Sequence, residues 1–204
     1  LVLRVRMQFR QRLLANRWLT PETRRYALEK LDKVSIKVGY PDAWIDHSPV
    51  DIRRDDYLGN ALRINEFRAR RDLARLGQPV VQDLFADPGA TLPIVINAAY
   101  EPSRNGIEIP AAFMQPPIYD PKADAAVNFC ALGAVIGHEI THGFDSQGRL
   151  YDAEGNVRDW WTGAEAAAWD TTAQRVVSLY DGLVYPGLPA IKVNGKLTRD
   201  ENVA

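Results

Sequence analysis

The pentapeptide His138-Glu139-Ile140-Thr141-His142 constrains this 204-residue chain more than any other feature of its sequence. Residues four apart on an α-helix lie one above the other on the same face, so this spacing brings the two imidazoles together. Two neutral imidazoles so placed can hold one Zn²⁺ ion, and Glu139 beside them can act as a general base toward water. Since only three histidines occur in the chain, a chance occurrence of the pattern is rare. The motif therefore predicts a zinc site on a helix.

A catalytic zinc site needs a third protein ligand. The remaining histidine, His47, lies in a polar segment, and we expect it at the surface. The position six residues after His142 is Gly148, which excludes the motif extended by a third histidine. A carboxylate is then expected, and both Glu165 and Glu201 lie at the start of a predicted helix. Spacing alone does not decide between these two glutamates.

Composition excludes several other classes of protein. The formal net charge is -1, so we expect no nucleic-acid partner,. No apolar run reaches the ~18 residues of a membrane span. The single cysteine, Cys130, rules out an intrachain disulfide, and its apolar neighbours predict a small buried side chain rather than a ligand or a nucleophile,. Helical spacing over Leu1–Leu14 and a helix start in Asp200–Ala204 lead us to expect a segment of a longer protein.

Periodicity and turn residues predict a mostly helical α+β fold. The Thr20-Pro21 pair is typical of a helix start, and Asn105-Gly106 is typical of a tight hairpin turn,. The predicted helices are 1–16, Thr20 to about Val38, Asp55–Leu76, Asp124–Phe144 and Thr162–Tyr180. The predicted strands are Leu92–Tyr100 and Ile107–Ile109, and a loop is predicted over Tyr185–Pro189.

Several segments resemble, in order, those of the neprilysin-like zinc endopeptidases (peptidase family M13). The zinc helix is a near-complete match, and weaker similarity runs through residues 20–80, so the resemblance covers nearly the whole chain. The matching segments are Asn97–Tyr100, Arg104–Ala111, Gln115–Pro117, Val135–Asp145, Asp159–Thr162, Val193–Gly195 and Glu201–Ala204.

This resemblance implies a fold, a cofactor and a ligand set. Residues 81–204 would form a gluzincin (thermolysin-like) catalytic domain, and residues 1–80 part of a helical domain that covers the cleft. One Zn²⁺ per chain would be held by His138, His142 and Glu201, with Glu139 as the general base. The resemblance thus selects Glu201 over Glu165.

The resemblance also implies how a peptide would bind. The Asn97 side chain and the backbone of Ala98 would hold the substrate's main chain. Separately, the position of Asp145 three residues after His142 on the helix makes it a candidate outer partner of the metal site, with a surface acid at the helix end as the alternative. A pocket for the residue after the scissile bond would be lined by four side chains, for which core packing is the alternative. These four are Phe113, Tyr119, Ala134 and Val135.

Two residues depart from the family's pattern: Asp200 replaces a glycine, and Ser146 replaces a second aspartate. The family's next aspartate, and the histidine and arginine that stabilise its transition state, would follow Ala204. The remainder of the catalytic domain is therefore an expected partner, and the isolated chain is expected to be weak or inactive.

The expected function is zinc-dependent endopeptidase activity on small peptides, with cleavage on the amino side of large hydrophobic residues. The alternatives are a non-catalytic zinc- or peptide-binding module and a zinc aminopeptidase. Animal members depend on several disulfides, so the single cysteine favours a bacterial member. We expect it in the periplasm, the cell envelope or outside the cell, with the cytoplasm as the alternative.

Overall fold

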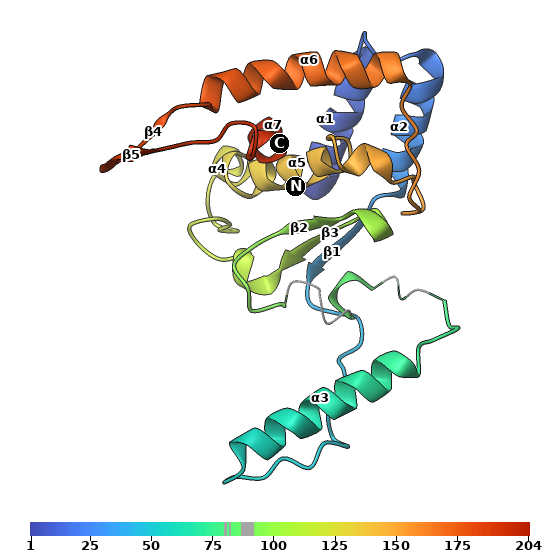
Figure 1. The fold of residues 1–204 in the computed structure, drawn as a ribbon, viewed down its shortest axis with the longest axis vertical. Helices are drawn as coiled ribbons and strands as arrows, with labels where there is room; N and C mark the ends of the chain where they lie inside the picture. Colours follow the sequence, from blue (N-terminus) through green and yellow to red (C-terminus); the bar gives the residue numbers. More distant parts are fainter. Residues whose placement is uncertain (80, 82, 87–91) are drawn as a thin grey trace.

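Helix α5 (Leu132–His142) crosses the middle of the molecule, between a three-stranded sheet and helix α6 (Figure 1). The computed structural model describes the whole chain except residues 80, 82 and 87–91. Its other helices and strands are α1 (Val2–Ala15), α2 (Pro21–Lys33), β1 (Ser35–Gly39), α3 (Tyr57–Leu73), β2 (Ala99–Glu101), β3 (Gly106–Pro110), α4 (Ala125–Cys130), α6 (Gly163–Tyr180), β4 (Val184–Tyr185), β5 (Leu188–Lys192) and α7 (Arg199–Val203). The mostly helical α+β architecture is confirmed.

Two helices begin where the sequence predicts. The Thr20 side chain accepts a hydrogen bond from the backbone of Thr23, and Pro21 occupies the first position of α2,. At α6, Thr162 and Glu165 form a reciprocal capping box,. Local capping chemistry fixes both starts, which explains why they can be predicted.

The first strand is a correction to the predicted helix that ran to Val38. Helix α2 ends at Lys33, and Ser35–Gly39 forms β1, which pairs in parallel with β3. Strand β2 pairs with the other edge of β3, so the sheet order is β1-β3-β2. Apolar Ile36 and Val38 alternate with polar Ser35 and Lys37, as in a strand. The partner strand β3, which stabilises this conformation, lies about 70 residues further along the chain.

Two further predictions, for a strand and for a loop, need correction. The strand predicted over Leu92–Tyr100 is confined to β2, because Leu92–Ile96 turns and forms no ladder with β3. The segment Tyr185–Pro189 is not a loop but the tip of the β4–β5 hairpin, where Gly187 has φ of 80°,. The turn at Asn105, with φ of 45°, is confirmed.

The helix predicted over Asp124–Phe144 is interrupted. Ala131, with φ of −94° and ψ of −90°, separates α4 from α5. Cys130 ends α4 and is exposed, so the prediction that it is buried is wrong.

The main core lies on the face of α5 opposite to its histidines. Ile136 and Ile140 have no exposed surface and pack with Leu31 of α2 and Ile107 of β3. At 100° per residue, a two-residue offset turns His138 about 200° away from Ile136. The apolar face therefore anchors the helix and turns the imidazoles outward.

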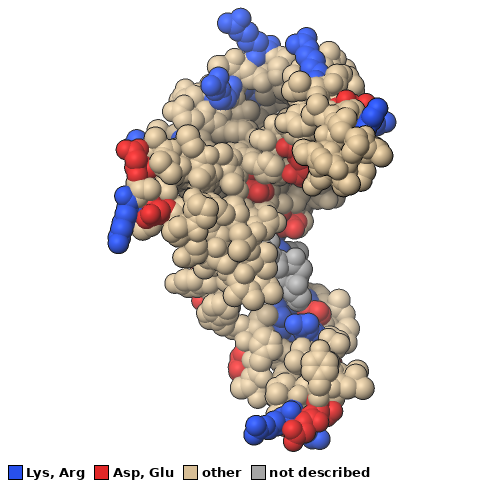
Figure 2. Space-filling model, turned by 90° about the vertical axis from the view of Figure 1, so that its left-hand side faces the viewer, with Lys and Arg blue, Asp and Glu red and all other residues tan. Residues whose placement is uncertain are grey.

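Helix α3 stands apart from the sheet and from α5 at the other end of the molecule (Figure 1). It begins where Asp56 caps the backbone of Gly59, and none of its residues is buried. On the face seen in Figure 2, acidic and basic side chains are scattered rather than gathered by sign. Among the described residues, no helix combines the length and apolar character that a membrane span requires.

The expected boundary at residue 80 stays a prediction. Helices α1 and α2 join the same buried core as α5, and β1 pairs with β3. Residues from both sides of the expected boundary thus build the support beneath the histidine helix.

Candidate metal centre

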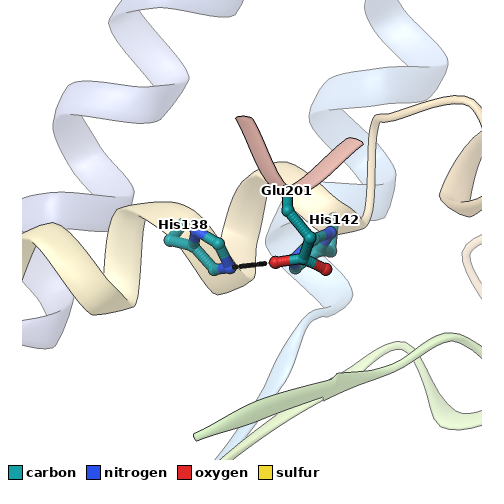
Figure 3. Close-up of side chains that lie close together, drawn as sticks. All are labelled: His138, His142 and Glu201. Atoms are coloured by element: carbon teal, nitrogen blue, oxygen red, sulfur yellow. Dashed lines mark hydrogen bonds and ion pairs between the residues drawn. The ribbon is translucent and has the colours of Figure 1, made fainter. Parts of the chain in front are cut away.

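The two imidazoles of α5 and the carboxylate of Glu201 point toward one common position (Figure 3). The His138 and His142 Nε2 atoms are 2.9 Å apart. Glu201, brought in by α7, places one carboxylate oxygen 3.2 Å from His138 Nε2 and the other 3.6 Å from His142 Nε2. Within the described part of the chain, this is the one group of three metal-ligating side chains that converge in this way.

These separations fit a tetrahedral zinc site. Ligands about 2.0–2.1 Å from Zn²⁺ in tetrahedral geometry lie roughly 3.3 Å from each other. The three distances above, from 2.9 to 3.6 Å, bracket that value. The donor set of two imidazole nitrogens and one carboxylate oxygen is also one that catalytic zinc sites use.

Asp145 fixes the orientation of His142. Its Oδ2 lies 2.8 Å from His142 Nδ1, and its Oδ1 accepts hydrogen bonds of 2.8 Å from the backbone of Gln147 and Gly148. The Asp145 carboxylate is buried, so it is not the surface acid of the alternative interpretation. When the Nδ1–H group of His142 donates its hydrogen bond to Asp145, Nε2 carries no proton and its lone pair faces the common position. The hydrogen bond to Asp145 also raises the pKa of His142,.

Glu139 lies beside the two histidines and is buried. Burial raises the pKa of its carboxyl, and nearby Glu201 adds to the rise, whereas His142 and a backbone hydrogen bond from Tyr100 oppose it,. Glu139 is not one of the three converging groups. Its carboxylate is therefore available for proton transfer at the edge of the site.

A cleft of about 530 Å³ opens over these residues. Asn97–Tyr100 line one wall, and Leu197, Asp200 and Glu201 line another. The cleft thus brings the predicted residues Asn97 and Ala98 to the same space as the histidines. Because β2 is an edge strand of the sheet, this wall can pair with an extended chain,.

The four residues predicted for a specificity pocket do not line this cleft. Phe113 and Tyr119 are half-buried and pack against the main core. Ala134 is exposed, and Val135 is half-buried, one turn before His138 on α5. The packing of Phe113 and Tyr119 agrees with the alternative that the sequence left open for them.

The rival ligand Glu165 has its carboxylate fully engaged elsewhere. One oxygen accepts a 2.7 Å hydrogen bond from the backbone of Thr20, and the other accepts from the Thr23 hydroxyl and from Thr162. Burial alone would raise the pKa of Glu165, but these hydrogen bonds outweigh it and lower the pKa to about 2,. Glu165 joins two helix starts and does not approach the histidines. His47 is exposed, as expected.

Two residues that support the site, Tyr100 and Lys30, were not predicted to do so. Tyr100 packs its ring against Gly143, where an added Cβ would lie 3.1 Å from the phenol. The Tyr100 hydroxyl donates a hydrogen bond to the side-chain oxygen of Asn105. Lys30 is fully buried and donates hydrogen bonds of 2.6 and 2.8 Å to the carbonyl oxygens of Gly148 and Tyr151. Lys30 thereby ties α2 to the loop that follows the histidine helix. A lysine inside an amphipathic helix gives no sequence signal of such a role.

The fold and the site together resemble those of metallopeptidases of the gluzincin class, and the comparisons with known proteins agree. Sequence patterns described as peptidase family M13 match residues 97–204 and residues 1–41. The chain belongs to peptidase family M13, which confirms the resemblance and the fold class. Membership in this family of zinc metalloproteases implies a zinc cofactor.

Neprilysin-1 of Caenorhabditis elegans is 36% identical over an alignment of 204 positions that covers 96% of this chain and 26% of the nematode protein. The neutral endopeptidase of Lactobacillus helveticus is 35% identical, over 96% of this chain and 30% of its own length. The crystal structure of the Mycobacterium tuberculosis zinc metalloprotease Zmp1 with an inhibitor is 40% identical, with a TM-score of 0.88 over 99% of this chain and 31% of that chain. The chain thus spans about a quarter to a third of the length of these relatives.

Proposed function

We propose that the natural protein carrying this chain is a zinc-dependent endopeptidase, with His138, His142 and Glu201 as the ligands of one Zn²⁺. The observation that carries this proposal is the convergence of three ligand side chains from two separate helices, whose nitrogen and oxygen atoms lie 2.9–3.6 Å apart. A Zn²⁺ ion bound there would polarise a peptide carbonyl and lower the pKa of a water molecule. Asp145 would hold His142 in the tautomer that ligation requires.

Glu139 would act as the general base and then as the general acid. Its buried carboxylate would accept the proton of the attacking water and deliver it to the leaving amine nitrogen. The base belongs to the same turn of α5 as the histidines, so the core beneath Ile136 and Ile140 holds all three side chains in register. The reaction forms no covalent bond between substrate and chain.

The substrate would bind as an additional strand. The edge strand β2 and the preceding residues Asn97 and Ala98 face the cleft, and an extended peptide can satisfy main-chain hydrogen-bonding groups along such an edge,. The Asn97 side-chain amide offers both a donor and an acceptor to that peptide. Cleavage on the amino side of large hydrophobic residues rests on the resemblance alone, since Phe113, Tyr119, Ala134 and Val135 do not line the cleft.

The test separates metal binding from catalysis in the natural protein. Glu139→Gln should retain one Zn²⁺ per chain, measured by metal analysis, and should lose peptide cleavage by roughly 10²–10⁴-fold, the usual contribution of a general base. Undiminished cleavage by this variant would refute the role of Glu139.

The two alternatives give different results with the wild-type protein. A zinc-binding module would take up Zn²⁺ and cleave no member of a peptide library. An aminopeptidase would cleave peptides with a free amino terminus and spare the same peptides when acetylated, whereas an endopeptidase would cleave both.

A further inference from the structure

Glu201 depends on its surroundings for its position more than the two histidines do. It lies on α7, which has only five residues, and its side chain is 67% exposed. A helix of this length is not stable by itself in water. The distance from the Glu201 carboxylate to the imidazoles therefore depends on what fastens α7 to the rest of the molecule.

Three side chains that take part in that attachment, Ser146, Arg199 and Asp200, bond to one another, and we call them the 146/199/200 cluster. Val203 of α7 also packs against the core, and Arg199 also pairs with Asp170 of α6 at 3.7 Å. The Ser146 hydroxyl donates to Oδ2 of Asp200 and accepts from the Arg199 guanidinium. Arg199 Nε also donates to Oδ1 of Asp200 at 3.0 Å. The guanidinium lies over the ring of Trp169 in α6, 5.1 Å from its centroid,. Each polar group in the cluster is thus bonded to the other two.

The cluster joins the two halves of the metal centre. Ser146 follows Asp145, the residue that orients His142, and Asp200 directly precedes Glu201. The side chains of Arg199 and Asp200 are 29% and 22% exposed, so water screens their contacts less than those of a fully exposed pair,. Both carboxylate oxygens of Asp200 are engaged within the cluster, which leaves Glu201 as the acid that faces the imidazoles.

The two positions at which the sequence departs from the family's pattern, 146 and 200, are in direct contact here. Ser146 lacks the carboxylate of the pattern's second aspartate, and Asp200 supplies a carboxylate where the pattern has glycine. In this chain the Asp200 carboxylate is paired with Arg199.

We propose that Ser146, Arg199 and Asp200 are positioning residues that hold the Glu201 carboxylate beside His138 and His142 and so set the affinity for zinc. This inference rests on the proposed metal centre and adds to it the means by which the third ligand is kept in place. Outer partners of metal ligands typically change metal affinity 10–100-fold.

The experiment measures Zn²⁺ affinity of the natural protein by competition with a chromophoric chelator, and the visible spectrum after Co²⁺ substitution. Ser146→Ala and Asp200→Asn should each weaken zinc binding by about 10-fold and alter the Co²⁺ spectrum. The double variant should be little weaker than the more affected single variant, because both changes break one contact. Ser146→Thr, which keeps the hydroxyl, should restore both readouts.

A matched control is Asp32→Asn, which removes an ion pair of 2.8 Å between α2 and Arg10 of α1 at a distance from the cleft. It should leave both the affinity and the Co²⁺ spectrum unchanged. Ser146→Ala changes no charge, so it separates positioning from simple attraction between Asp200 and the cation. Unchanged affinity and spectrum in Ser146→Ala would overturn the inference, even if thermal stability falls. Weakening by Asp200→Asn alone would also overturn it.

Glu201→Ala in the same assay separates this inference from the proposed function. If Glu201→Ala leaves zinc affinity unchanged, the ligand assignment itself fails. If Glu201→Ala weakens binding and Ser146→Ala does not, the ligand assignment stands and only the positioning role is lost.

Discussion

Two glutamates at helix starts, Glu165 and Glu201, have opposite surroundings in this molecule. Glu165 is buried at 2% exposure, and its carboxylate accepts hydrogen bonds from Thr20, Thr23 and Thr162. Glu201 is mostly exposed, and its carboxylate oxygens face the two imidazoles. A carboxylate whose lone pairs are satisfied by the chain stabilises the fold, whereas one that faces other ligand atoms is available to a cation.

The largest expected effect is on zinc affinity and comes from removing the exposed Glu201 carboxylate. Glu201→Ala should weaken Zn²⁺ binding by more than about 100-fold, beyond the range seen for outer partners of ligands, because a direct ligand is lost. The unfolding free energy of the metal-free protein should change little, since this side chain is exposed,. Chelator competition and thermal unfolding in EDTA measure the two quantities. Equal loss of zinc in Glu165→Ala and Glu201→Ala would erase the distinction between the two glutamates.

Glu165→Ala should have the reverse effect. Loss of the buried carboxylate leaves the Thr20 and Thr162 backbone donors without their partner, which should lower the unfolding free energy by roughly 2–3 kcal/mol. The pKa of Glu165 is lowered to about 2, so its contribution is present above pH ~5 and fades as the pH falls toward 2,. Urea unfolding of wild type and variant from pH 7 to pH 2 measures whether their unfolding free energies become equal as the pH falls. A difference in stability that stays constant with pH would contradict it.

Asp145→Asn tests a residue that shares features of both glutamates. Its carboxylate accepts hydrogen bonds from the chain, as that of Glu165 does, and it also contacts a proposed ligand histidine. An amide can place its NH₂ group toward Nδ1 and so disfavour the tautomer that frees Nε2. Zinc affinity should fall about 10–100-fold, less than for Glu201→Ala. Isothermal titration with Zn²⁺ checks the value, and an unchanged affinity would show that Asp145 serves only the turn at Gly148.

A dependence of stability on pH is expected from Lys30, a buried amine that donates two hydrogen bonds to the same loop. Burial lowers the pKa of Lys30 to about 8, against opposition from Asp145 and Asp152,. Between pH 8 and about 10.5 the unfolded chain binds this proton and the folded chain does not, so stability should rise with pH. Relative to Lys30→Met, the wild-type unfolding free energy should gain up to about 1.4 kcal/mol per pH unit in that window. Parallel pH profiles for the two proteins would contradict the burial of a titrating amine.

The same contrast explains what could be predicted from sequence. The positions of His138, Glu139 and His142 follow from helical spacing, and the starts of α2 and α6 follow from capping residues within three positions. The choice between Glu165 and Glu201 depends on contacts more than 50 residues away along the chain, and only the family resemblance favoured one of them. The structure shows why the two glutamates differ. The Glu165 carboxylate is bound by Thr20 and Thr23 at the start of α2, more than 140 residues away along the chain.

The errors have the same origin. Strand β1 was predicted as the end of a helix because its partner β3 is distant in sequence, and parallel pairing leaves no turn signal beside it,. The 146/199/200 cluster could not be predicted either, because Ser146 and its two partners are more than 50 residues apart in the sequence. Ser146 and Asp200 were noted only as departures from the family's pattern. Nothing in the local sequence around Ala131 announces the break between α4 and α5.

The most direct test of the metal centre is a crystal structure of the natural protein with Zn²⁺, located by anomalous scattering at the zinc edge. The account predicts a single peak about 2.0–2.2 Å from His138 Nε2, His142 Nε2 and a Glu201 oxygen, with Glu165 still bound to its threonines. A zinc peak held by the histidines with Glu201 turned away, or a peak at another carboxylate, would contradict it.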